Sequence, residues 1–165
     1  MTETNENRCL MAPVCKFAGK GSHCHDLCFP FRKAHGESGE SGVVALAGVP
    51  KKYKTANVTN LPIKEDNPDV YEAVMAICES IEDFIDEGVG LYLYSSPNKD
   101  NPKGTGTGKT TTALTILNTY LQHRLVQHIK QERDIKELPA LFIKASKLQN
   151  QYNAQFRGTI EEQQE

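Results

Sequence analysis

The stretch Gly104-Thr105-Gly106-Thr107-Gly108-Lys109-Thr110-Thr111 decides the fold that the sequence predicts. An apolar, β-like run from Val89 to Ser95 precedes it, and a long segment with helical periodicity follows it. Glycines let consecutive backbone N–H groups converge on one anion, because they have no Cβ to block the turn or the ligand. A helix behind the loop adds its free N-terminal N–H groups and the positive end of its dipole. The order of strand, loop and helix therefore predicts a phosphate-binding loop.

Each part of this loop has an expected role. The glycine-rich part is expected to cradle the phosphates of ATP, Lys109 to reach the β- and γ-phosphates, and the Thr110 hydroxyl to bind Mg²⁺. The predicted nucleotide-binding residues are Gly104, Thr105, Gly106, Thr107, Gly108, Lys109, Thr110 and Thr111.

The loop departs from the pattern G-x-x-x-x-G-K-[ST] at one position, where the chain has Lys103 in place of the first glycine. That glycine serves a tight exit from the strand. The polar, turn-rich insertion at residues 96–102 makes the exit longer, so the glycine is not required there. The alternative interpretation is a flexible Gly/Thr linker that contains Gly-Lys-Thr by chance.

Apolar periodicity and capping signals predict the remaining elements. They are a helix that begins at Asn67-Pro68 and ends at Gly88, a helix from Lys109 to near Lys130, a strand from Ala140 to Ala145, and a helix from Ser146 to Gly158. Strand, loop, helix, strand and helix form a βαβα unit, so the predicted fold class is α/β with a parallel sheet.

Four of the five cysteines lie near the N-terminus, in the pattern Cys9-x5-Cys15-x8-Cys24-x3-Cys28. Such clustering in an intracellular chain indicates a metal rather than disulfides, and four thiolates can surround one Zn²⁺. The spacings are not those of tight C-x2-C knuckles, so buried or incidental free cysteines are the alternative. His35 is the expected substitute if one cysteine is not a ligand. Residues 1–42 are thus expected to form a small zinc module and its linker, and residues 43–165 a separate core.

Composition restricts the class of protein. The formal net charge of −2 creates no overall basic field for nucleic acid, and the hydrophobic share of 38% indicates a modest core. The chain has no long apolar run and no signal-peptide pattern at its start, which predicts a cytoplasmic protein that does not contact a membrane. Residues 43–54 are expected to form an extended connector. Its Lys51, Lys52 and Lys54 either meet nucleic acid or form a solvated charged turn.

The acid that ATP hydrolysis needs is missing from the sequence. In P-loop enzymes a second strand ends in an acidic residue that holds Mg²⁺ and polarises the attacking water, and no such run follows residue 140. The acidic residues at 79–87 lie on a helix ahead of the loop and are expected to face solvent. The chain is therefore interpreted as a truncated product or a fragment, with no catalytic residue assigned.

Five stretches in this order resemble the N-terminal half of bacterial or bacteriophage replicative-helicase loaders of the DnaC/DnaI type, which are AAA+ ATPases. They are the cysteine cluster closing on His35-Gly36, the segment Val49 to Val58, Gly90 to Ser95, Gly104 to Thr111, and Ala140 to Ala145 leading into Tyr152-x-x-x-Phe156-Arg157. The resemblance implies an incomplete AAA+-like core. It also implies that residues around Val49 to Asn57 line the adenine side of the nucleotide.

The function that this resemblance implies is loading or regulation of a replicative DNA helicase by an ATP-binding protein in a bacterial or phage-infected cell. The implied partners are the helicase, single-stranded DNA and other loader subunits. One alternative is a non-hydrolysing adaptor, whose zinc module binds a partner protein while the phosphate loop is vestigial. A small P-loop kinase is a further alternative, although such enzymes also need downstream acidic and arginine residues.

Overall fold

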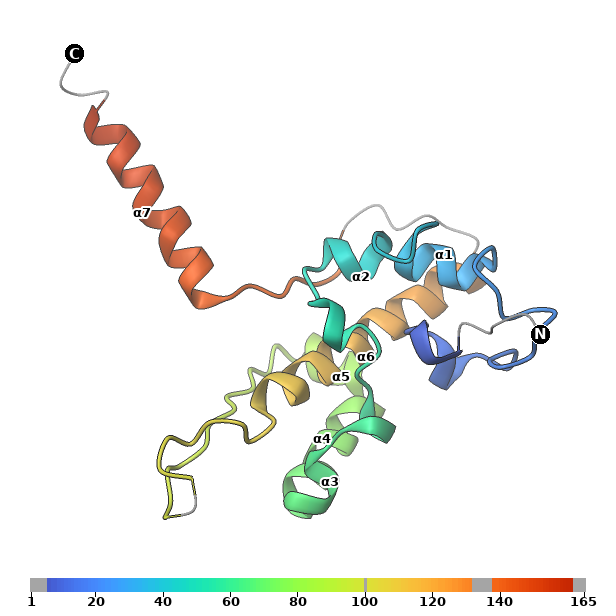
Figure 1. Ribbon diagram of the computed structural model, residues 1–165, viewed down its shortest axis with the longest axis horizontal. Coiled ribbons are helices and arrows are strands. Elements are labelled where there is room, and N and C mark those ends of the chain that lie inside the picture. The colour runs from blue at the N-terminus through green and yellow to red at the C-terminus, as the bar shows by residue number, and fades with distance from the viewer. Residues whose placement is uncertain (1–5, 100, 132–137, 162–165) are drawn as a thin grey trace.

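The computed structural model describes residues 6–99, 101–131 and 138–161, with side chains up to residue 155. Within these ranges every regular element is a helix. Figure 1 shows α1 to α5 gathered around one long helix, α6, and α7 extending away from them. The α-helices are α1 (Phe29–His35), α2 (Gly42–Leu46), α3 (Ile63–Asp66), α4 (Pro68–Glu79), α5 (Ile81–Asp86), α6 (Lys109–Lys130) and α7 (Ala145–Glu161), and the 3₁₀ helices are η1 (Glu6–Arg8), η2 (Ala12–Val14), η3 (Lys51–Tyr53) and η4 (Val58–Asn60).

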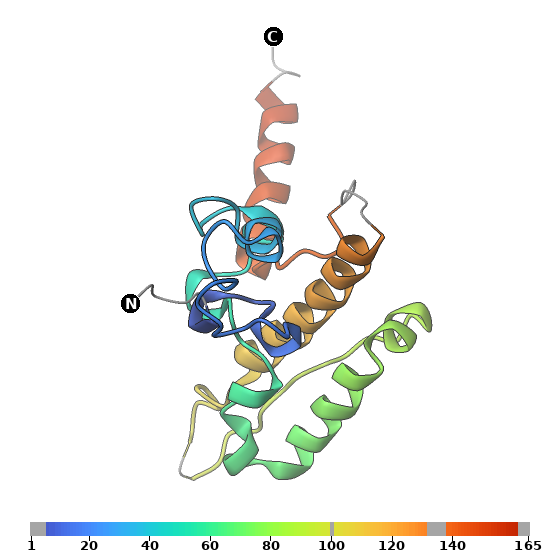
Figure 2. The ribbon, with the colours of Figure 1, turned by 90° about the vertical axis from the view of Figure 1, so that its right-hand side faces the viewer.

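Helix α6 is the element on which most of the others pack. It begins directly after Gly108 and ends at Lys130, as the sequence predicts. Helices α1 and α2 lie on one side of it and α4 and α5 on another, as Figures 1 and 2 show. Apolar residues at steps of three and four predict a buried face that begins at Ala113, but Ala113 is exposed and Leu114 is buried instead. The face also includes polar residues, namely Thr112, Thr115, Asn118 and Gln122.

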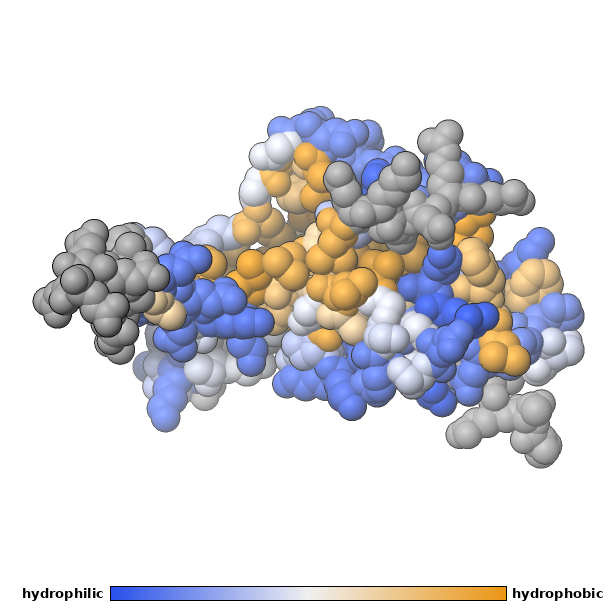
Figure 3. All heavy atoms as spheres, turned by 90° about the horizontal axis from the view of Figure 1, so that it is seen from above, coloured by the Kyte–Doolittle hydropathy of each residue, from blue (hydrophilic) through white to orange (hydrophobic). Residues whose placement is uncertain are grey.

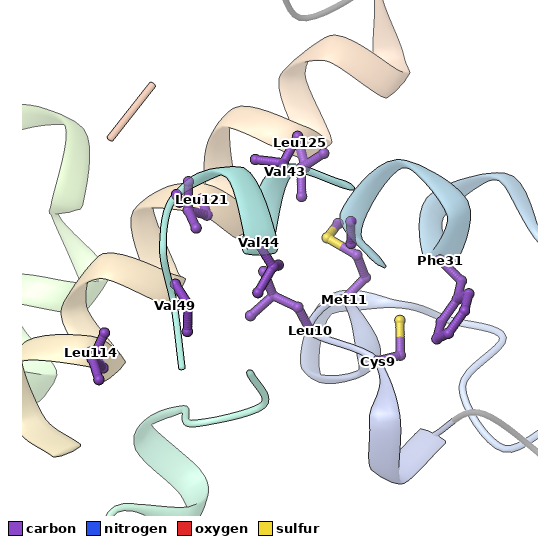
Figure 4. Close-up of a cluster of buried hydrophobic side chains, with 12 residues drawn as sticks. Cys9, Leu10, Met11, Phe31, Val43, Val44, Val49, Leu114, Leu121 and Leu125 are labelled. Carbon is purple, nitrogen blue, oxygen red and sulfur yellow. The ribbon is translucent and has the colours of Figure 1, made fainter. Parts of the chain in front are cut away.

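The main hydrophobic core joins the N-terminal segment to α6. Leu10 and Met11 are buried against α2, and Leu121 and Leu125 of α6 belong to the same cluster (Figure 4). Burial of one leucine side chain contributes about 1.5–3 kcal/mol, so this cluster is the main source of stability. Residues from both sides of the predicted boundary after residue 42 share one core.

A smaller cluster attaches α3 and α4 to the opposite part of α6. Leu61, Ile63 and Val74 form it, and Cys78 packs against it, as expected from its place on the apolar face of the predicted helix. The Asn67 side chain caps α4 by accepting a hydrogen bond from the Val70 N–H at 3.2 Å, which confirms the predicted helix start. The predicted single helix is interrupted at Ser80, which divides it into α4 and α5.

The predicted parallel sheet is absent from the described residues, and the α/β fold class is therefore wrong. Residues 89–98 and 138–144 form neither helix nor strand, and no backbone hydrogen bond joins the two segments. A strand is stable only when a neighbour pairs with its N–H and C=O groups. Tyr92 is 85% exposed, whereas the second segment reaches the helical body where the Phe142 N–H donates to the Ala47 carbonyl at 2.8 Å. The apolar pattern predicts a strand in each segment, but it does not indicate which segments pair with each other.

The predicted extended connector at residues 43–54 is also wrong, because α2 and η3 occupy it. Close packing of α2 onto α1 requires Gly42. A Cβ on this residue would lie 2.7 Å from the carbonyl oxygen of Ala34, and its φ is +71°. Val43 and Val44 can then enter the core directly after the glycine.

Helix α7 leads away from the rest of the molecule in Figures 1 and 2. It begins at Ala145, one residue before the predicted start, and continues through Gly158 to Glu161.

Seen from above in Figure 3, apolar residues gather over the middle of the molecule, with polar residues around them. Among the helices that the structure describes, none is both long enough and apolar enough to span a bilayer.

Candidate functional site

The glycine-rich loop lies at the N-terminal end of α6 and has the backbone that only glycine adopts easily. The φ angles of Gly104, Gly106 and Gly108 are +57°, +75° and +81°. Gly108 is the N-cap of α6 in the left-handed conformation. A Cβ at Gly108 would lie 2.7 Å from Cγ2 of Ile63, so the glycine also allows α3 to pack against the loop. The predicted loop–helix junction is therefore formed, although no strand leads into it.

Lys109 turns back over the loop that precedes it. Its Nζ donates to Ser95 Oγ at 2.6 Å, to the Gly104 carbonyl at 2.9 Å and to Thr107 Oγ1 at 3.0 Å. Ser95 Oγ in turn donates to the Gly104 carbonyl at 2.5 Å. The cation is thus held within the predicted phosphate cradle by two oxygen atoms of the loop and by the Ser95 hydroxyl.

The polar insertion before the loop forms a turn built on Asn101. The Asn101 side chain accepts from the Thr105 N–H at 3.3 Å and donates to the Thr105 carbonyl at 2.7 Å. Its backbone carbonyl accepts from the Gly104 N–H at 3.0 Å. Asn101 therefore fixes the entry to the loop, a role that the sequence reading missed although asparagine is a frequent turn former.

Two grooves border the loop and meet at Lys109. The first has a volume of about 510 Å³ and is lined by residues 105–111, by Tyr53 and by α3, including Asp66. The second, of about 430 Å³, is lined by Tyr94, Ser95 and the start of α4. Seven of the eight predicted nucleotide-binding residues, Thr105, Gly106, Thr107, Gly108, Lys109, Thr110 and Thr111, thus line one groove, and Gly104 is buried beneath them.

The segment from residue 49 to residue 57 reaches this groove through Tyr53. The Lys52 ammonium and the Thr111 hydroxyl lower the pKa of Tyr53. The buried Asn118 of α6 holds the segment in place, because its Nδ2 donates to the carbonyls of Tyr53 at 2.8 Å and Ala56 at 2.9 Å. The sequence analysis assigns no role to Asn118. An amide side chain within the apolar face of a helix indicates a buried hydrogen-bonding residue.

The four N-terminal cysteines are brought together around one small cavity. Cys9, Cys15, Cys24 and Cys28 all line a space of about 20 Å³, together with Phe17, His23 and Phe31. Burial, followed by the neighbouring thiols, raises the pKa of Cys9 to about 11, partly offset by the backbone at Met11. Among the described residues, however, no three His, Cys, Asp or Glu side chains are arranged closely enough to hold a metal ion. The sequence therefore predicts the convergence of the thiols, and a zinc centre stays a prediction.

His35 has a structural role in the core. Its Nε2 accepts a hydrogen bond from the Leu10 N–H at 2.8 Å, and the residue is 1% exposed. Burial, with the charges of Lys54 and Arg8, lowers the pKa of His35 to about 4. His35 joins the N-terminal segment to α1 and does not line the cysteine cavity.

The predicted basic patch is paired in part within the molecule. Glu40 accepts from Lys54 at 3.0 Å and lies 3.1 Å from Lys51. Lys52 stands over the ring of Tyr53, 4.6 Å from its centroid. One carboxylate thus pairs with two of the three lysines, and the choice between a nucleic-acid surface and a solvated charged turn stays open.

The arrangement at the end of α6 can bind an anion, because it combines loop N–H groups, a helix N-terminus and the Lys109 ammonium in one groove. Thr110 and Thr111 add hydroxyl groups to the same groove. Comparisons of this chain with models of protein families, with curated proteins and with solved structures found no match in any of the three.

Proposed function

We propose that this chain binds ATP at the loop before α6. The observation that carries the proposal is the shared groove, in which residues 105–111 meet Tyr53 of a distant segment. The phosphates would be bound by the loop and by Lys109, and the adenine side would lie near Tyr53. Thr110 offers a hydroxyl to the magnesium ion that accompanies ATP, and Mg²⁺ prefers such oxygen ligands. The metal would neutralise phosphate charge.

The Lys109 side chain must exchange its present partners for phosphate oxygens when ATP binds. Its three present acceptors are neutral, whereas phosphate oxygens are charged and form stronger hydrogen bonds with an ammonium group. The stronger hydrogen bonds to phosphate therefore favour the exchange. The neutral loop oxygens hold the ammonium at the cradle beforehand, which limits the entropy lost on binding.

Substitution of Lys109 tests ATP binding. We expect Lys109→Ala to weaken binding of a fluorescent ATP analogue about 10- to 100-fold, because a hydrogen bond from a charged group contributes roughly 1.5–3 kcal/mol. Lys103→Ala is the matched control, because Lys103 is an exposed lysine that lines neither groove. Unchanged affinity in Lys109→Ala, or an equal loss in both variants, contradicts the proposal.

The biological role that we propose is loading or regulation of a replicative DNA helicase in the cytoplasm of a bacterial or phage-infected cell. It rests on the resemblance of the five ordered stretches to helicase loaders. Single-stranded DNA and other loader subunits are further proposed partners. Immobilised chain should retain a purified bacterial replicative helicase in the presence of ATP, and Lys109→Ala should retain less. Failure to retain helicases from several bacteria would count against this role.

A second candidate function is a non-hydrolysing adaptor that binds a partner protein through a zinc module. The convergence of Cys9, Cys15, Cys24 and Cys28 on one cavity favours it. Zinc would be held by these thiols as thiolates, and binding would release their protons. Burial already disfavours the Cys9 thiolate, so the metal would have to overcome that cost.

Metal analysis of the purified chain tests the zinc proposal. We expect about one zinc per chain in the wild type and a loss in Cys15→Ser or Cys28→Ser. Cys78→Ser is the control, because Cys78 packs in the α4 cluster away from this cavity. A chain that folds fully without metal, or equal zinc in all variants, rejects the zinc module and the adaptor that depends on it.

A further inference from the structure

Asp66 places a carboxylate in the groove that is proposed to bind ATP phosphates. It is the last residue of α3, and it lines the same groove as Thr110 and Thr111. Its role is not recognisable from the sequence, because the acidic residue of P-loop enzymes is expected at the end of a second strand. This inference rests on the proposed function.

Packing at the start of α3 fixes where Asp66 lies. Ile63 is 5% exposed and packs against Gly108 so closely that a Cβ there would be 2.7 Å from its Cγ2. Asp66 follows three residues later, which is nearly one helical turn, and so it comes from the same side of α3 as Ile63. The contact that anchors the helix on the loop therefore also directs Asp66 towards the groove.

The charge of Asp66 has no counterpart among the described residues. None of the ion pairs in the described part of the chain includes it, and it is exposed. Lys109, a cation that lines the same groove, is held by Ser95, Gly104 and Thr107. A free carboxylate beside a phosphate cradle repels a triphosphate, and a divalent cation between them reverses the sign of this interaction.

We propose that Asp66 faces the magnesium ion of bound Mg–ATP and makes nucleotide affinity depend on a divalent cation. Mg²⁺ is usually bound by one or two carboxylates together with phosphate oxygens and water, and Asp66 with the Thr110 hydroxyl offers protein oxygen ligands of this kind. The acidic residue thus comes from α3, ahead of the loop in sequence. Asp66 selects the magnesium complex of the nucleotide over the free nucleotide.

Binding of a fluorescent ATP analogue, measured with excess Mg²⁺ and with EDTA, tests this inference. For the wild type we expect Mg²⁺ to strengthen binding about tenfold. For Asp66→Asn we expect affinity in EDTA to rise about threefold or more and the stimulation by Mg²⁺ to fall to about twofold or less, because the repulsion and the metal ligand are lost together. Asp66→Glu keeps the carboxylate and should keep most of the Mg²⁺ dependence.

Glu65→Gln is the matched control. Glu65 is the neighbouring acidic residue of α3, is exposed, and lines neither groove, so its neutralisation changes the net charge equally. Wild-type Mg²⁺ dependence in Asp66→Asn overturns the inference, and so does an equal change in Glu65→Gln. If the wild type binds no analogue with or without Mg²⁺, the proposed ATP site itself fails. Analogue binding that Lys109→Ala weakens but Asp66→Asn leaves equally dependent on Mg²⁺ rejects only the role of Asp66.

Discussion

The middle of α6 and its first turn lie in opposite environments. The middle carries Leu121 and Leu125 into the main core, and Gln122 Nε2 donates to the Leu10 carbonyl there. Its N-terminal end is bordered by the glycine loop and two grooves, where Thr110 is exposed. One helix therefore joins a stabilising region to a polar candidate binding site. Substitutions in the buried middle of α6 should affect folding, and those in its first turn should affect ligand affinity.

The largest expected effect on stability is in the buried middle of α6. Leu121→Ala should lower the free energy of unfolding by about 2–5 kcal/mol, because it removes apolar contacts and leaves a cavity in the core. Urea denaturation followed by circular dichroism measures this change. Thr110→Ala at the exposed end should change the free energy of unfolding by about 0.5 kcal/mol or less. Equal losses in the two variants would remove the distinction between the ends.

Acid should destabilise the folded chain through His35 of α1, which is buried beside Leu10. In the unfolded chain a histidine takes up its proton near pH 6.5, whereas the folded His35 does so only near pH 4. The unfolded state thus binds more protons between these values, so the free energy of unfolding falls as the pH falls through this window. The shift corresponds to a loss of about 3 kcal/mol by pH 4.

Urea denaturation at pH 7, 5 and 4 checks this pH dependence. His35→Gln is the comparison, because glutamine can accept a hydrogen bond from the Leu10 N–H but does not titrate. The variant should lose less stability than the wild type on acidification. Parallel curves for the two proteins would mean that other groups govern the acid response.

The smallest expected effect concerns the affinity for the ATP analogue and comes from the contacts of Lys109. Ser95→Ala removes one of the three acceptors that hold the Lys109 ammonium. We expect it to strengthen binding of the ATP analogue about fivefold, because the lysine then gives up one hydrogen bond fewer, at a net value of about 1 kcal/mol. Ser96→Ala is the control, since Ser96 lines the same groove but is not among the three acceptors of the Lys109 ammonium. Weaker binding in Ser95→Ala would instead show that Ser95 positions the lysine for phosphate.

The sequence predicts local features of this molecule well and long-range pairing poorly. Asn67 at the start of α4 and Gly108 at the start of α6 are recognisable because capping and left-handed glycines depend on neighbouring residues. The runs at residues 89–95 and 140–145 are apolar enough for strands, yet a strand also needs a partner that lies far away in sequence. Helix α2 was missed because Val43 and Val44 are β-branched, and contact with α1 overrides their local preference.

The candidate site shows the same limit. Residues 104–111 are identifiable from their order, since the loop geometry depends on glycines that alternate with threonines over a short stretch. Asp66 and Tyr53 enter the groove only because α3 and η3 pack against the loop and α6. Ser95 is not identifiable as a partner of Lys109 until the fold brings them together.

By itself, the sequence determined the glycine loop, the start and end of the helix behind it, and the cysteine cluster, because each is encoded within a short stretch. Only the tertiary structure decided that the described chain is helical, that the N-terminal segment shares its core with α6, and that an acidic residue ahead of the loop faces the groove. These outcomes depend on contacts between distant segments. Such contacts are selected by the total apolar area buried and by the pairing of polar groups, and residue spacing along the chain records neither quantity.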